Sequence, residues 1–343
     1  MVANTPTEWP GIGRPIAHAD LPQHLFRVAA LHARRALADA TDDLAVLDRA
    51  GSIGISMELL AKSALAHLNP ALLAAERESK HLLLFSGVAT VSAEKAKTRT
   101  GPDCLAVLRQ ANHPIDYSQE RDAAVFDVRN LAQHLGFVDP ASFDGALNTM
   151  VALAEQIIAI VASYDPLLDR AAFWGLQSLP QVDERLKAQA EARRLKLEQL
   201  KAAAMREIER LRARGLDDDI LSEWADREPP AYFDEGGNAR DDIFVRRPCP
   251  ACKFEGWLEY LMYRGPIEYD YGDNDGAPVT WVDVEYEPRE FHCQVCSLRL
   301  GDDLLYLEGM GETRYETVDP TPDELLAAEE AAVELYYEEQ RGR

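Results

Sequence analysis

We expect neither a secretory signal nor a membrane-spanning segment in this sequence of 343 residues. The first fifteen residues have no basic start followed by an apolar core, as a signal peptide would. The longest apolar stretch, at residues 150–163, contains Glu155 and Gln156 and is too short to cross a bilayer. Cysteine is also scarce: five residues form an odd set that does not suit a disulfide framework. We therefore expect a cytoplasmic protein with reduced thiols and no membrane partner.

Basic residues are scarce as well: the chain has 36 Lys and Arg against 59 Asp and Glu, which gives a net charge of -23. The excess of acidic residues is unevenly distributed along the chain. Residues 1–145 hold 14 basic and 17 acidic residues, whereas from residue 301 onward 13 acidic residues face three arginines. An acidic surface repels nucleic acid at long range. Any RNA contact is therefore expected to be local and to lie in the N-terminal half.

What the sequence does have is helical periodicity. Spacings of three and four between apolar residues predict helices at residues 20–40, 42–49 and 55–68, the last ended by Asn69-Pro70. A further helix is expected after Asp116, capped by Ser118 and ending at Gly136, and another at residues 146–164, opened by Asp139 or Ser142. Together these helices predict an α-helical bundle.

The second half of the chain changes character. Residues 182–214 predict one long charged helix, which we interpret as a solvated arm between two domains. Pro229-Pro230 and Gly236-Gly237 mark a boundary, residues 244–308 are rich in β-forming side chains, and residues 321–340 predict an acidic helix. The expected fold class is mainly α. Its four parts are a helical bundle (20–165), a helical arm or linker (166–228), a small β-rich domain (240–312) and an acidic C-terminal helix (318–343).

The most informative stretch of the bundle is Arg129-Asn130-Leu131-Ala132-Gln133-His134. Helical spacing predicts that its buried stripe comprises Val125, Val128, Ala132 and Leu135. A second stripe contains Phe126, Asn130 and His134, and we expect it to face a partner such as a second copy of the chain.

The segment RNLAQHLG resembles the R-x(4–6)-H signature of the HEPN superfamily, and MELLAKSAL, with Glu58 and Lys62, resembles a helix often found earlier in those bundles. The likeness covers about residues 20–165. It implies an all-α bundle, a homodimer, and a metal-independent endoribonuclease of the kind used in antiviral defence, toxin–antitoxin or RNA-processing systems. On this resemblance Arg129, Asn130 and His134 form the catalytic site.

The residue types suit that chemistry. RNA supplies its own nucleophile, the 2′-hydroxyl, so cleavage needs proton transfer and stabilisation of the phosphate charge. His134 can move protons near neutral pH, Arg129 can fork onto phosphate oxygens, and Asn130 can orient either group.

The clearest metal signal is a pair of CxxC motifs, Cys249–Cys252 and Cys293–Cys296, separated by strand-like sequence. Four thiolates on two tight turns complete a tetrahedral Zn(II) shell with no open position, so we expect structural zinc in a module that resembles a zinc ribbon. The intervening segment is acidic, which favours a protein regulator over a phosphate backbone as the module's partner. Cys104 is interpreted as a small buried hydrophobe.

Two functions of different classes remain open. The first is an endoribonuclease that acts on RNA, with a zinc module that regulates it or binds a partner. The second is a non-catalytic HEPN dimerisation or binding module whose zinc ribbon mediates protein or nucleic-acid interactions. A zinc hydrolase is disfavoured, because no histidine or carboxylate has open-site spacing near either CxxC motif.

Overall fold

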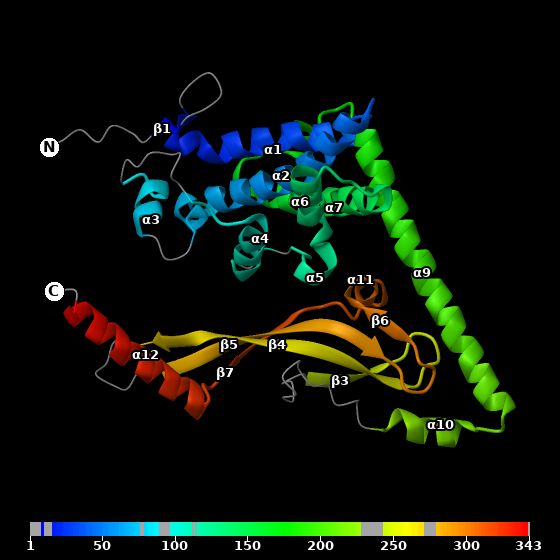
Figure 1. Ribbon diagram of the computed structural model, residues 1–343. Helices are drawn as coiled ribbons and strands as arrows, with labels where there is room; N and C mark the ends of the chain where they lie inside the picture. Colours follow the sequence, from blue (N-terminus) through cyan, green and yellow to red (C-terminus); the bar gives the residue numbers. More distant parts are fainter. Residues whose placement is uncertain are drawn as a thin grey trace. The chain divides into compact units, whose positions relative to one another are not determined.

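A computed structural model describes residues 8–9, 16–75, 79–88, 97–111, 113, 115–227, 243–270 and 279–341. The chain is mainly α with a small antiparallel sheet, as expected (Figure 1). It divides into two compact units, Met1–Gln189 and Ala190–Arg343. The boundary expected at Pro229-Pro230 and Gly236-Gly237 lies outside the described residues.

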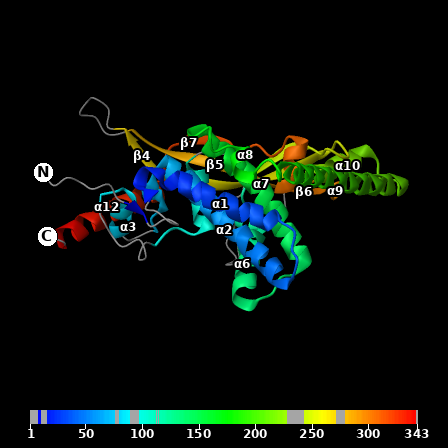
Figure 2. The same ribbon diagram turned by 90° about the horizontal axis from the view of Figure 1, so that it is seen from above.

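The N-terminal unit is built from helices. They are α1 (Leu21–Leu37), α2 (Asp43–Leu68), α3 (Ser79–Phe85), α4 (Gly101–Gln110), α5 (Gln119–Asp122), α6 (Ala124–Leu135), α7 (Pro140–Tyr164) and α8 (Arg170–Trp174). Two short strands, β1 (Glu8–Trp9) and β2 (Ile16–Ala17), pair antiparallel before α1. The α1 and α2 helices lie side by side in both views (Figure 1, Figure 2).

The α2 helix corrects one sequence prediction. Residues 42–49 and 55–68, expected as separate helices, belong to one helix of 26 residues that the Asp42 side chain caps by accepting from the Ala45 amide. Gly51 and Gly54 lie inside it and are buried. A Cβ at Gly54 would stand 2.8 Å from Cβ of Arg129 on α6, so the glycine allows α6 to approach closely. Tertiary packing here outweighs the low helix propensity of glycine.

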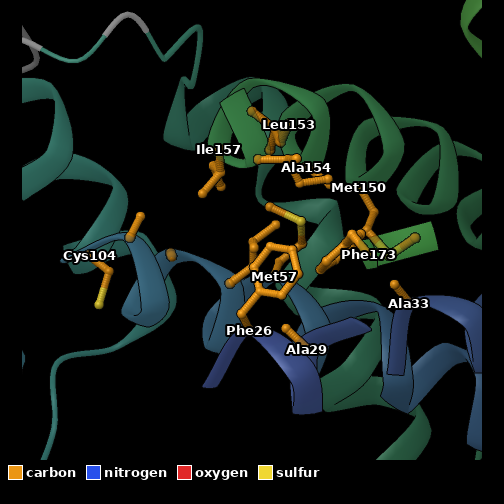
Figure 3. Close-up of a cluster of buried hydrophobic side chains, with 14 of the residues drawn as sticks. Phe26, Ala29, Ala33, Met57, Cys104, Met150, Leu153, Ala154, Ile157 and Phe173 are labelled. Carbon is orange, nitrogen blue, oxygen red and sulfur yellow. The ribbon is translucent and has the colours of Figure 1, made fainter. Parts of the chain in front are cut away.

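Buried side chains from several helices meet in one core. Phe26 of α1, Met57 of α2 and Phe173 of α8 converge there with Leu153 and Ile157 of α7 (Figure 3). The rings of Phe26 and Phe173 make an edge-to-face contact with centroids 5.3 Å apart. Each such side chain contributes about 1.5–3 kcal/mol through removal from water. This core fixes α2 and α7, the two helices against which α6 packs.

The α7 helix begins at Pro140, and Asp139, one of the two residues expected to open it, caps it by accepting from the Ser142 amide. At 25 residues it is long and apolar enough to cross a membrane by length and composition, unlike the shorter stretch considered in the sequence. In the described part of the chain no other helix passes that test, and 56% of its apolar window is buried inside the protein. Most of its apolar side chains belong to the core of the bundle.

The long helix α9 (Leu179–Ala213) contributes to both units. Val182 is buried in the N-terminal core, and Leu197, Ala204, Ile208 and Leu211 are buried in the core of the C-terminal unit. Residues 182–214, expected as a solvated arm, therefore provide packing surface at both ends. The helix α10 (Asp218–Ala225) follows and buries Leu221 and Ala225 in the second core.

The C-terminal unit contains one antiparallel sheet. Its strands are β3 (Ile243–Pro248), β4 (Glu255–Asp270), β5 (Val279–His292), β6 (Arg299–Gly301) and β7 (Arg314–Val318). They are ordered β3-β4-β5-β6, with β7 also paired to β5 (Figure 1). A short helix, α11 (Asp302–Leu305), follows β6.

The acidic C-terminal helix is confirmed as α12 (Pro322–Arg341). Thr321 and Glu324 cap its start reciprocally, since the Thr321 amide donates to Glu324 Oε2 at 2.7 Å and the Glu324 amide donates to Thr321 Oγ1 at 3.3 Å. Arg264 of β4 binds both carboxylate oxygens of Glu324, at 2.5 and 3.0 Å. One glutamate therefore both starts the helix and anchors it to the sheet.

Candidate functional site

The α6 helix carries the arginine–asparagine–histidine stretch. Val125, Val128 and Ala132 are buried as expected, and Gly136 ends the helix in the left-handed region at φ 62°. Leu135 is wrong as a core prediction, because its side chain is 73% exposed. It lies in the last turn, where the helix has run past the surface that it packs against.

Arg129 points toward α2 rather than into solvent. Its Nη1 donates to Glu58 Oε2 at 2.6 Å, and the other carboxylate oxygen of Glu58 accepts from Lys62 Nζ at 2.5 Å. Lys62, which is 7% exposed, also donates to Thr98 Oγ1 at 2.8 Å. Glu58 and Lys62 stand four residues apart on α2, whereas Arg129 and Thr98 are distant from them in sequence.

The electrostatics of this network favour ionised groups. Burial alone would raise the pKa of the Glu58 carboxyl, but the hydrogen bonds and charges of Lys62 and Arg129 outweigh burial and hold that pKa below its usual range. Nε of Arg129 is buried and has no hydrogen-bond partner. The guanidinium is thus fixed by one carboxylate and keeps donor capacity that the described chain does not use.

Asn130 and His134 lie on the opposite, exposed side of α6. Within the part of the chain that the structure describes, no hydrogen bond joins either side chain to Arg129. The three predicted catalytic residues therefore share one helix, but a single chain does not bring their functional groups to one point. Exposed apolar side chains surround His134: Leu131 is 39%, Leu135 73% and Phe137 59% exposed.

The four cysteines of the CxxC motifs do come together. Their Sγ atoms all lie within 4.8 Å of one another, with Cys249–Cys296 at 3.6 Å and Cys252–Cys293 at 3.5 Å. Among the described residues this is the one group of three or more His, Cys, Asp or Glu side chains close enough to hold a metal ion.

Two matching turns create this geometry. In the first, the Lys253 amide donates to the Cys249 carbonyl at 3.0 Å, and the Cys249 amide donates to the Phe254 carbonyl at 2.8 Å. In the second, the Cys293 amide donates to the Leu298 carbonyl at 2.9 Å. The residue after each CxxC motif adopts positive φ, 71° at Lys253 and 59° at Ser297. Each turn thereby aims two thiols at the same point.

The cluster fits a tetrahedral metal. Zn–S bonds of about 2.3 Å place sulfur atoms about 3.8 Å apart, which is close to the observed spacings. A bound cation deprotonates coordinating thiols outright. These four residues can therefore hold a metal ion of the size and preference of zinc.

Cys104 takes no part in that cluster. It is fully buried on α4, and burial raises the pKa of its thiol to about 12. Its interpretation as a buried hydrophobe agrees with this environment.

Searches of protein-family profiles, of curated proteins and of solved structures found no match to this chain.

Proposed function

We propose that the N-terminal unit is a HEPN-type endoribonuclease that acts without a metal, and that the four cysteines bind structural Zn(II). The observation that carries the first part is the pair between Arg129 and Glu58. It joins the two segments on which the HEPN resemblance rests, RNLAQHLG and MELLAKSAL, across 71 residues of sequence. A motif arginine held on a fixed carboxylate is pre-organised, as phosphate recognition requires.

The proposed chemistry uses three side chains. His134 takes the proton from the 2′-hydroxyl of RNA, and the resulting oxygen attacks the adjacent phosphorus. Arg129 stabilises the charge on the non-bridging oxygens through donors that Glu58 leaves unused. Asn130 orients the phosphate or the imidazole. The His134 imidazolium returns that proton to the leaving 5′-oxygen as its bond to phosphorus breaks, and the upstream RNA end becomes a 2′,3′-cyclic phosphate.

A second copy of the chain would complete the site. Arg129 faces inward and His134 faces outward, so one chain alone presents a divided set of groups. The exposed Leu131, Leu135 and Phe137 supply apolar area for a two-fold contact along α6. Such a homodimer places His134 of one copy beside the α6 helix of the other.

The zinc assignment rests on the donor set. Among the described residues the group consists of four cysteines alone, and four thiolates form a closed shell that stabilises a small β unit and supplies no activated water. The acidic unit that carries it suits a regulatory protein partner better than a nucleic-acid backbone. We place the protein in the cytoplasm, in antiviral defence or toxin-like growth arrest.

One observation favours a second function. Arg129 has a carboxylate partner, and a paired arginine can be purely structural. The bundle would then be a non-catalytic HEPN dimerisation or binding module, and the zinc ribbon would mediate protein or nucleic-acid interaction.

Cleavage of a mixed RNA pool in EDTA distinguishes the two functions. We expect the unmutated protein to cut and to leave cyclic phosphate ends, and Arg129→Ala and His134→Ala to lose at least a hundredfold in rate. His113→Ala, a half-buried histidine elsewhere in the unit, is the matched control and should retain the activity. Absence of cutting by the unmutated dimer would support the binding module.

A further inference from the structure

A groove of about 290 Å³ crosses one face of the sheet in the C-terminal unit. Its walls are supplied by four strands that lie side by side (Figure 1): Ile243 and Val245 of β3, Tyr260 of β4, Tyr286 of β5, and Arg314 and Glu316 of β7. Ligand pockets span about 300–1,000 Å³. This groove therefore suits one small ring system rather than a folded partner.

The aromatic floor already stacks on a guanidinium. Cζ of Arg314 lies 5.2 Å from the centroid of the Tyr260 ring, and Tyr260 is only 3% exposed. Arg314 itself is exposed, and no carboxylate among the described residues forms an ion pair with it. Its hydrogen-bond donors consequently remain available at the mouth of the groove.

A hydrogen-bond acceptor, the Glu316 carboxylate, lies two residues after Arg314 on β7. Tyr286 Oη donates to Glu316 Oε2 at 3.2 Å, which orients the carboxylate and leaves its other oxygen without a hydrogen bond in the described chain. Because side chains two apart in a strand share a face, Arg314 and Glu316 stand about 7 Å apart at their Cα atoms. The groove thus offers a planar donor fork and an acceptor beside aromatic walls, with no net formal charge.

The surroundings restrict the ligand further. Residues 243–343 hold 23 acidic and nine basic side chains, so a ligand recognised mainly through phosphates would be repelled. Recognition must depend on an uncharged planar group that both accepts from an arginine and donates to a carboxylate.

We propose that this groove binds a guanine base. Guanine presents two adjacent acceptors, O6 and N7, that match the arginine fork, and two donors, N1–H and N2–H, that match a carboxylate. Adenine places a donor beside N7, and uracil has no amino group, so neither satisfies both Arg314 and Glu316. Because Arg314 already covers the buried Tyr260 ring, a base would stack on the half-buried Tyr286 ring, which gives affinity to every base without selectivity.

The proposal does not depend on the nuclease activity. The same ring occurs in a free guanine nucleotide and in an unpaired residue of a nucleic acid strand. In a strand, neighbouring nucleotides lie beside the base, whereas a free nucleotide has none. The experiment includes both kinds of ligand.

Binding would be measured by calorimetry on the full-length protein with zinc bound, using guanosine, GMP, adenosine, cytidine and uridine. We expect guanosine to bind at least tenfold more tightly than adenosine or uridine, with cytidine between them, and little change in affinity with salt. Glu316→Gln should remove the preference for guanosine, and Arg314→Gln should weaken guanosine binding ten- to a hundredfold. Arg299→Gln and Glu290→Gln, on neighbouring strands outside the groove, should change neither value.

The source is resolved with the DNA pentamers TTGTT and TTATT, which lack the 2′-hydroxyl and are not cleaved. Tighter binding of TTGTT than of guanosine assigns the groove to a strand, and equal binding assigns it to a free nucleotide. The proposal is overturned if no nucleoside saturates the protein at millimolar concentration, or if Arg314→Gln leaves guanosine binding unchanged. It is also overturned if the groove binds a basic peptide more tightly than guanosine. In that case Glu316→Gln would weaken peptide binding and Arg314→Gln would strengthen it.

Discussion

The pair between Glu58 and Arg129 yields the most exacting test of the fold around the candidate site. Glu58→Gln keeps the shape of the side chain and removes its charge. It leaves Lys62, whose side chain is 8% exposed, and Arg129, which is 27% exposed, without their shared counter-ion. Removal of one partner from a buried ion pair costs about 3–5 kcal/mol. Since the Glu58 side chain is 23% exposed, solvent offsets part of that loss, and we expect about 2–3 kcal/mol.

Hydrogen-exchange mass spectrometry suits this test, because it separates peptides of α2 and α6 from the second unit. A loss of that size corresponds to exchange about 30- to 150-fold faster in those peptides. Asp48→Asn is the matched control. It removes the carboxylate from the pair with Arg35, whose side chain is 61% exposed, and should accelerate exchange less than about fivefold.

The same pair predicts a pH dependence. The folded pKa of Glu58 lies below its unfolded value, so the stabilisation is fully present above the unfolded value and is lost as pH falls through the folded value. The difference between the unmutated protein and Glu58→Gln should therefore be constant near neutral pH and shrink below about pH 4. Equal exchange rates in Glu58→Gln and Asp48→Asn would refute the assignment of a buried, charge-paired network.

Four further predictions concern other parts of the chain. The unmutated protein should carry one zinc per chain by plasma mass spectrometry, whereas Cys293→Ser should carry none and should expose the sheet to limited proteolysis. The Cys104 thiol, with its pKa near 12, should stay unmodified by thiol reagents at pH 8 in the zinc-bound protein, while chelation releases four reactive thiols. The pKa of Glu324 is held at about 2 by its arginine partner, so α12 should stay docked as pH falls to that value, whereas Glu324→Gln should accelerate its amide exchange at neutral pH. In Gly54→Ala the new Cβ would stand 2.8 Å from a side chain of α6, so this variant should lower the free energy of unfolding by about 1–3 kcal/mol. Gly145 has open space around it, so Gly145→Ala should raise the free energy of unfolding by about 0.5–1 kcal/mol.

The cysteine cluster could be predicted because its chemistry is local. Each CxxC motif forms a turn whose hydrogen bonds span at most six residues, and the antiparallel pairing of β4 with β5 brings the two turns together. The acidic helix could be predicted for the same reason, since Thr321 and Glu324 cap it within one turn. Short-range patterns of this kind need no knowledge of the tertiary fold.

The network around Arg129 could not be predicted in the same way. Its members lie on α2, on α6 and at Thr98, and no spacing rule connects residues so far apart in sequence. The continuity of α2 was missed for a related reason. Gly51 and Gly54 weaken a helix locally, and the close approach of α6 at Gly54 explains why a glycine occurs inside one.

Arg129 has two possible roles, structural and catalytic, and the Arg129→Lys variant separates them. Lysine retains the positive charge and can still reach Glu58, so we expect the exchange rates of α2 and α6 to change by less than about fivefold. An ammonium group cannot place two parallel donors on a phosphate, so a catalytic arginine replaced by lysine should lose most of its activity. A stable but inactive Arg129→Lys protein would mean that the guanidinium acts on RNA. A variant as active as the unmutated protein would mean that Arg129 serves only to hold α6 against α2 through Glu58.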